Sequence, residues 1–113
     1  MTSINTVMPR ISRNKDKCAT GHLCTKKVSV NASQYSVFVN GRPALRRGDK
    51  CKRHTMNFPP PPGSKKKFIC LIHNAKVKQG SRRVFVGGIP VARKGDRADK
   101  GAMVGASRNV FAG

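Results

Sequence analysis

Short cysteine–histidine pairs are the part of this sequence best suited to chemistry. Each of the three histidines follows a cysteine by three or four residues. The pairs are Cys18 with His22, Cys51 with His54, and Cys70 with His73, and Cys24 lies two residues after His22. Thiolates and imidazoles are the usual ligands of zinc, which takes four of them in a tetrahedron. The spacing therefore predicts a structural metal site, which a small, highly charged domain would use to stabilise its fold.

Two other interpretations of the cysteines stay open. They can be small buried residues beside surface histidines, although three repeated pairs weigh against this. They can also form disulfides, for instance between Cys18 and Cys51. The N-terminus lacks the apolar stretch of a secretory signal peptide, so we expect no export by that route, and thiols stay reduced in the cytosol. Metal ligands or free thiols are therefore favoured over disulfides.

Carboxylates are too few for acid–base catalysis. The chain has four acidic residues, and three of them, Asp16, Asp49 and Asp96, each follow an arginine by three residues. We expect these aspartates to fix their local turns, by pairing with the arginine or by accepting bonds from turn amides. Only Asp99 remains, which leaves no carboxylate pair and little support for a catalytic metal. The sequence predicts that the protein is not an enzyme.

An internal repeat must position these side chains. Residues 37–49 return in register as residues 84–96. Residues 11–16 resemble the second half of this block, and residues 110–113 repeat its first half. Repeated units pack on one another to bury their apolar faces. The pattern predicts three rounds of one motif, opened and closed by half units.

Each repeat has the sequence of a β-hairpin. Val-Phe-Val runs lead into Asn40-Gly41 and Gly87-Gly88, pairs typical of a tight two-residue turn. Side chains alternate across a strand, so either the valines or the phenylalanines fill the interior. Further strand signals lie at 28–30, 68–72 and 103–104, and no window has a helical period. We predict an all-β fold.

The domain organisation is expected to be simple. We predict one domain over residues 1–113, with an N-terminal tail at 1–8 and an inserted surface loop at 55–67. The loop contains four prolines, a glycine and three lysines, a composition that does not suit a helix or a central strand. A proline-rich ligand for an aromatic groove is the alternative.

Charge indicates an anionic partner. The chain carries 24 Lys and Arg against 4 Asp and Glu, a formal net charge of +20. Such a charge favours nucleic acid, lipopolysaccharide or phospholipid. The strongest rival function is a basic zinc-stabilised nucleic-acid-binding domain. With one Tyr, five Phe and no Trp, however, the chain has little material for base stacking, and we see no amphipathic helix typical of a membrane-active peptide.

Several short sequence segments, taken together, are similar to those of PAAR-repeat proteins. Pro-Ala-Ala-Arg is matched loosely at 43–46 and 90–93, while Val-Phe-Val-Asn-Gly at 37–41, the two Gly-Asp endings and the terminal Val-Phe-Ala-Gly match closely. The opening Asp16-Lys17-Cys18 with Gly21-His22 also fits. The resemblance runs from about Pro9 to the end of the chain.

The resemblance implies a pseudo-threefold cone of short β-hairpins. In this family the cone is the tip of a contractile phage tail or type VI secretion spike. Its flat base docks on a trimeric β-helical spike, one tip per trimer. The implied location is the distal end of the spike in a virion, and the implied role is to help pierce an anionic target envelope, with nucleic acid an unlikely partner.

The resemblance also implies a metal near the apex, zinc with iron as the other candidate, held by three histidines and a cysteine. His22, His54 and His73 fall where those histidines are expected. The family's cysteine commonly follows the last Gly-Asp, but loop 95–101 has none. We predict Cys70 as the fourth ligand, ahead of Cys24, Cys51, Cys18 and Asp99.

Overall fold

The fold consists of short strands joined by turns. A computed structural model describes residues 8–113, so most of the predicted tail at 1–8 lies outside the described residues. The strands are β1 (Lys17–Ala19), β2 (Lys27–Ser29), β3 (Phe38–Val39), β4 (Arg42–Pro43), β5 (His54–Phe58), β6 (Ile69–His73), β7 (Phe85–Val86), β8 (Ile89–Pro90), β9 (Arg97–Ala98) and β10 (Gly101–Met103). The prediction of an all-β fold is confirmed. Within residues 8–113 there is no helix of the length and apolar character that would cross a membrane.

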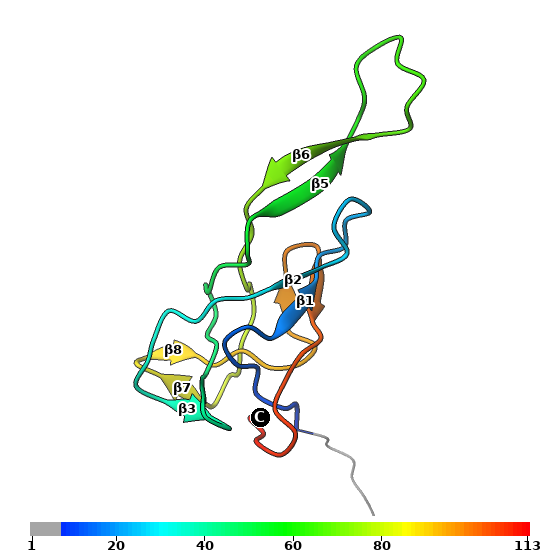
Figure 1. Cartoon of the computed structure of the whole chain (residues 1–113). Helices are drawn as coiled ribbons and strands as arrows, with labels where there is room; N and C mark the ends of the chain where they lie inside the picture. The colour runs from blue at the N-terminus through cyan, green and yellow to red at the C-terminus, as the bar shows by residue number, and fades with distance from the viewer. Residues whose placement is uncertain (1–7) are drawn as a thin grey trace, which may run out of the picture.

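All strand pairs are antiparallel. A four-stranded sheet has the order β2-β1-β10-β9, and three separate hairpins are formed by β3–β4, β5–β6 and β7–β8. Figure 1 shows that the β5–β6 hairpin projects from one end of the molecule, whereas β3, β7 and the C-terminus lie toward the other end.

The duplicated segments fold as equivalent hairpins. Asn40, Gly41, Gly87 and Gly88 all have positive φ, between 52° and 79°. This is the backbone of a type I′ turn, whose twist matches that of the flanking strands. The valines Val39 and Val86 are buried and the phenylalanines beside them are exposed, which decides between the two alternating sets.

The two ends of the described chain make the third hairpin. The N–H of Ile11 donates to the carbonyl of Val110 at 2.8 Å. The corresponding bonds in the other copies run from Ala44 to Val37 at 3.0 Å and from Val91 to Val84 at 3.1 Å. The predicted half units therefore join to complete one copy.

A closed ring of backbone hydrogen bonds holds the three copies around one axis. Ser12 donates to Ala92 at 2.9 Å, Ala92 to Leu45 at 2.8 Å, and Leu45 back to Ser12 at 3.0 Å. These residues occupy the same position in their repeats, and all three are fully buried. The ring gives the molecule its pseudo-threefold axis, as the cone-like fold predicts.

Two apolar clusters lie along this axis. The first gathers one inward residue pair from each hairpin and comprises Ile11, Val39, Ala44, Val86, Val91 and Ala112. The second is formed mainly by the segments that follow the repeats and includes Cys18, Val28, Val30, Leu45, Cys51, Val77, Ala98 and Met103. Burial of these side chains provides the main driving force for folding.

The repeat aspartates close their turns, as predicted. Backbone N–H groups of Arg13, Arg46 and Arg93 donate to the aspartate three residues later at 2.7–2.8 Å. The guanidinium groups of Arg13 and Arg93 also pair with that carboxylate. The Arg46 guanidinium instead donates to the Val86 carbonyl at 3.1 Å and so links two repeats.

The inserted loop is shorter than the predicted segment 55–67. Strand β5 pairs with β6 over five residue pairs, from His54 with His73 to Phe58 with Ile69. The loop therefore spans residues 59–68. Prolines, which lack the N–H that a strand pair requires, begin only at Pro59, so the residues before it remain free to pair.

Candidate metal centre

The three histidines converge on one aspartate. His22 lies in the segment between β1 and β2, and His54 and His73 face each other as the first register pair of β5–β6. Asp99 lies in the turn between β9 and β10. The four side chains offer ligand atoms that all lie within 4.8 Å of one another.

The contacts are short and largely dry. The Nε2 atoms of His22 and His73 lie 2.9 Å from Oδ1 of Asp99, and Nε2 of His54 lies 2.8 Å from Oδ2. The His22, His54 and Asp99 side chains are at most 3% exposed, whereas that of His73 is 24% exposed. The group is thus sealed except on the His73 side.

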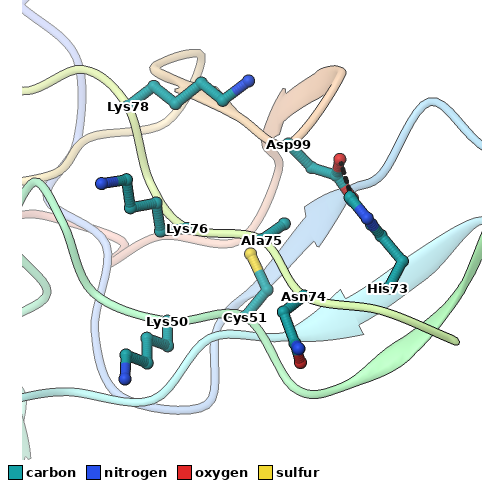
Figure 2. Close-up of a pocket in the computed structure, with 8 residues that line it drawn as sticks. All are labelled: Lys50, Cys51, His73, Asn74, Ala75, Lys76, Lys78 and Asp99. Atoms are coloured by element: carbon teal, nitrogen blue, oxygen red, sulfur yellow. Dashed lines mark hydrogen bonds and ion pairs between the residues drawn. The ribbon is translucent and has the colours of Figure 1, made fainter.

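An open cavity adjoins that side. It has a volume of about 530 Å³, and Figure 2 shows Asp99 bonded to His73 beside it, with three lysines farther along its wall, Lys50, Lys76 and Lys78. The lysines place positive charge around the group of histidines. Asp99 is the one negative charge within that group.

The tautomer of His54 tests whether this group fits a metal. Its Nδ1 lies 2.8 Å from the Lys52 carbonyl, which only accepts, so Nδ1 carries the hydrogen. In neutral His54, Nε2 then presents a lone pair to the Asp99 carboxylate 2.8 Å away, and two acceptors repel. A cation between them, or a proton on Nε2, removes this conflict. A carbonyl partner on the other ring nitrogen is the usual support of a metal-binding histidine, so the residues fit the group.

Close backbone approach positions the Asp99 turn. A Cβ on Gly101 would lie 1.9 Å from the carbonyl oxygen of Ala19, and one on Gly21 would lie 2.8 Å from Cβ of Lys100. Glycine at both positions lets the turn pack against the segment that leads to His22. Asp99 itself has φ 56°, a conformation that Asp adopts more readily than most residues.

Asp99 remains ionised. Burial opposes its charged form, but hydrogen bonds from His73, His54 and His22, which for His54 require a proton on Nε2, outweigh burial and hold the pKa of Asp99 below its ordinary value. A permanent carboxylate is the form that binds a cation.

Cys70 does not join this group. Its sulfur is bonded to Cys24, in a disulfide that ties the loop after β1 to strand β6. Cys70 and His73 are three residues apart on a strand, so they lie on opposite faces. The structure therefore places Asp99, and not Cys70, beside the three imidazoles.

The other two cysteines are buried free thiols. Cys18 and Cys51 occupy equivalent repeat positions, and their sulfurs lie 3.7 Å apart without a bond between them. Hydrogen bonding between the thiols lowers the pKa of Cys18 and raises that of Cys51. The expectation of free thiols holds for this pair, whereas Cys24 and Cys70 depart from it.

From the sequence we place Asp99 behind the four cysteines as fourth ligand, although the sequence contains a signal for it. It is the single acidic residue outside the repeat positions, and it lies in the loop after the last Gly-Asp. An acidic residue without a structural role in the repeat is a good ligand candidate.

Comparison with known proteins identifies the family. A model of the PAAR motif family matches residues 27–106, which is more than half of the 113-residue chain. No curated protein matches the chain. The PAAR motif implies a structural role at the spike tip of contractile injection systems. The repeat, the ring of hairpins and this match agree, and the chain belongs to the PAAR motif family.

Proposed function

We propose that this protein caps the trimeric central spike of a contractile injection machine, such as a phage tail, and sharpens it for passage through a target envelope. When the machine contracts, a narrow tip concentrates force on a small area. This role needs a rigid cone and a base that fits a threefold partner. It needs no catalytic residue.

Three exposed phenylalanines carry the proposal. Phe38, Phe85 and Phe111 hold the same position in the three hairpins and are 53%, 52% and 47% exposed. Strands β3 and β7, which contain Phe38 and Phe85, and the C-terminal segment that contains Phe111 lie at the end of the molecule opposite the β5–β6 hairpin (Figure 1). Large exposed aromatic side chains are typical of a protein interface, and a threefold arrangement suits the end of a trimer.

We further propose that His22, His54, His73 and Asp99 hold one structural zinc ion, with iron as the alternative. Three imidazoles and a carboxylate are ordinary zinc ligands. A four-coordinate ion supplies folding free energy. The protein's own contribution is to bring ligands from all three repeats to one point, because His22 follows the first, His54 and His73 follow the second, and Asp99 follows the third.

Mixing the protein with its cognate spike tests the docking. We expect one copy per trimer by native mass spectrometry, and a complex with three copies per trimer contradicts the proposal. Phe85→Ser should weaken the complex at least about tenfold, because it removes a large apolar side chain that docking on the spike would bury. Ile72→Ser is the matched control: Ile72 is 66% exposed but lies on the distant hairpin, so the affinity should not change.

A further inference from the structure

The β5–β6 hairpin is longer than a capping role requires. The third repeat closes the equivalent segment with a tight turn between β9 and β10, whereas the second extends it into two five-residue strands and the loop 59–68. The hairpin continues outward from its root at His54 and His73 (Figure 1). If the proposed function holds, this hairpin is the first part to meet the target.

One face of the hairpin is braced by the loop after β1. Residues paired across the strands share a face, and successive pairs alternate. On this face Asn57 accepts from the N–H of Leu23 at 3.1 Å, Thr55 bonds Thr25 at 2.9 Å, and the Cys24–Cys70 disulfide adds a covalent link. The hairpin is thereby held to the body of the cone.

The opposite face begins with the His54–His73 pair at the root and is apolar farther out. It carries the register pairs Met56 with Leu71 and Phe58 with Ile69. Phe58 is 47% and Leu71 44% exposed, and the other two are half-buried. Neither of the two apolar clusters includes any of these four side chains. A contiguous apolar strip of this kind on a thin, projecting ribbon is suited to an interface with another phase or molecule.

The hairpin is cationic at its loop and at its root. Lys65, Lys66 and Lys67 are exposed in the loop, and Lys52 and Arg53 are exposed at the root. The sequence contains no Asp or Glu from residue 50 to residue 95, so no carboxylate within the hairpin offsets this charge. The apolar strip and the lysines together make the hairpin amphipathic and basic.

We infer that the β5–β6 hairpin binds the surface of a lipid bilayer that carries anionic headgroups. This inference rests on the proposed function and names the surface that the tip contacts first. The apolar strip lies among the upper acyl chains while the lysines reach the headgroup phosphates. The outer edges of the two strands stay at the wet interface, because an open hairpin cannot satisfy its backbone groups within the bilayer core.

A nucleic acid explains this hairpin less well. Phosphates would account for the lysines but give no role to Met56, Ile69 and Leu71. Stacking on bases needs exposed aromatic rings, and Phe58 is the single Phe, Tyr or Trp within strands β5 and β6. The apolar strip therefore favours lipid.

Vesicle binding tests the charge. Full-length protein is sedimented with phosphatidylcholine vesicles, with and without phosphatidylglycerol. We expect binding to the anionic vesicles and at least about tenfold weaker binding after joint Lys65→Gln, Lys66→Gln and Lys67→Gln substitution. The control removes the same charge elsewhere, through Lys17→Gln, Lys78→Gln and Lys94→Gln. Equal losses in both triple variants would show attraction by net charge alone and overturn the inference.

A matched pair of variants tests the apolar strip. Leu71→Ser should weaken vesicle binding several-fold, whereas Ile72→Ser, one residue along on the other face, should not. The chain has no Trp, so Phe58→Trp provides a single reporter whose emission should shift to the blue with anionic vesicles. An unshifted emission, or a larger effect of Ile72→Ser, would contradict the inference. So would tighter binding to duplex DNA than to the vesicles at the same salt.

The spike complex separates the two proposals. The Lys65–Lys67 triple variant should still bind one copy per spike trimer. Loss of vesicle binding with intact docking shows that the hairpin contacts lipid. Wild-type protein that docks on the spike but does not bind anionic vesicles overturns this inference and leaves the capping role standing. Wild-type protein that binds the vesicles but not the spike overturns the capping role and leaves lipid binding standing.

Discussion

At the scale of single residues, Asp99 has the largest effect on the centre. Three imidazole nitrogens lie within 2.9 Å of its two oxygens, and the surroundings are dry. Without a cation, this arrangement requires protons on nitrogens that also approach one another. The same atoms are well placed around an ion, and the Lys52 carbonyl already fixes one ring.

Replacing Asp99 with Asn should empty the site. Asn keeps the shape and tolerates positive φ, but it removes the negative charge that balances the ion. We expect zinc, measured by elemental analysis, to fall from about one per chain to a small fraction, and the free energy of unfolding to fall by about 3 kcal/mol or more. Cys70→Ser is the control and should retain its zinc. Loss of zinc in Cys70→Ser with retention in Asp99→Asn would restore the cysteine as ligand.

Acid should release the ion through the imidazoles rather than through Asp99. Imidazole binds metal only in its neutral form, so protons compete with the ion for the three rings as the pH falls. The lowered pKa of Asp99 means that its charge, and the stability that depends on it, persists as pH falls until pH passes below the ordinary carboxyl value. Dialysis at a series of pH values should show that zinc is lost before the pH falls to the ordinary carboxyl range of about 4. Retention of zinc to about pH 3 would argue against histidine ligands.

At the scale of elements, the β5–β6 hairpin depends on links at its root. One link is the metal centre, and the other is the disulfide between Cys24 and Cys70, which are 46 residues apart. Both join the hairpin to the loop after β1. A two-stranded hairpin alone is marginal in water, so these links explain how it projects as an ordered ribbon.

Removing the disulfide should loosen the hairpin more than the cone. Closing a loop of this length stabilises a fold by up to about 4 kcal/mol. We expect Cys70→Ser to lower the unfolding midpoint in denaturant and to speed amide exchange in residues 54–73. A reductant should do the same to the wild type and nothing further to Cys70→Ser. An additional effect of reductant on the variant would mean that other sulfurs are cross-linked.

At the scale of the whole molecule, the cone depends on closure by its two ends. The third hairpin unites residues near 11 with residues near 111, and the backbone ring passes through all three copies. Most contacts join residues far apart in the sequence, so each copy depends on the other two. A change in the last residues therefore reaches the core.

Ala112→Asp should test this closure. Ala112 is 1% exposed within the first apolar cluster, so the substitution buries a charge without a partner. We expect a loss of about 3 kcal/mol or more in the free energy of unfolding, measured by denaturant titration. Asn109→Asp, an exposed neighbour with the same added charge, should change it by less than about 0.5 kcal/mol. Equal effects would show that the C-terminal segment does not pack as described.

The sequence alone predicted the repeat, its hairpins and its closing half units. These follow from local chemistry, because Asn-Gly and Gly-Gly turns and the Arg and Asp of each turn act within a few residues. The turn residues are copied from repeat to repeat, so their roles can be read without a fold. That the three histidines belong to one centre came from the resemblance to the PAAR family rather than from the repeat.

Only the tertiary structure decided which fourth side chain lies beside the histidines. Cys70 is near His73 along the chain, but strand geometry turns it to the other face, toward Cys24. Asp99 is far from His22 in sequence and reaches it because two glycines let their backbones touch. The face of a residue depends on whether its segment is a strand, and a contact across the axis depends on all three copies. Both are properties of the assembled fold, which spacing along the chain does not contain.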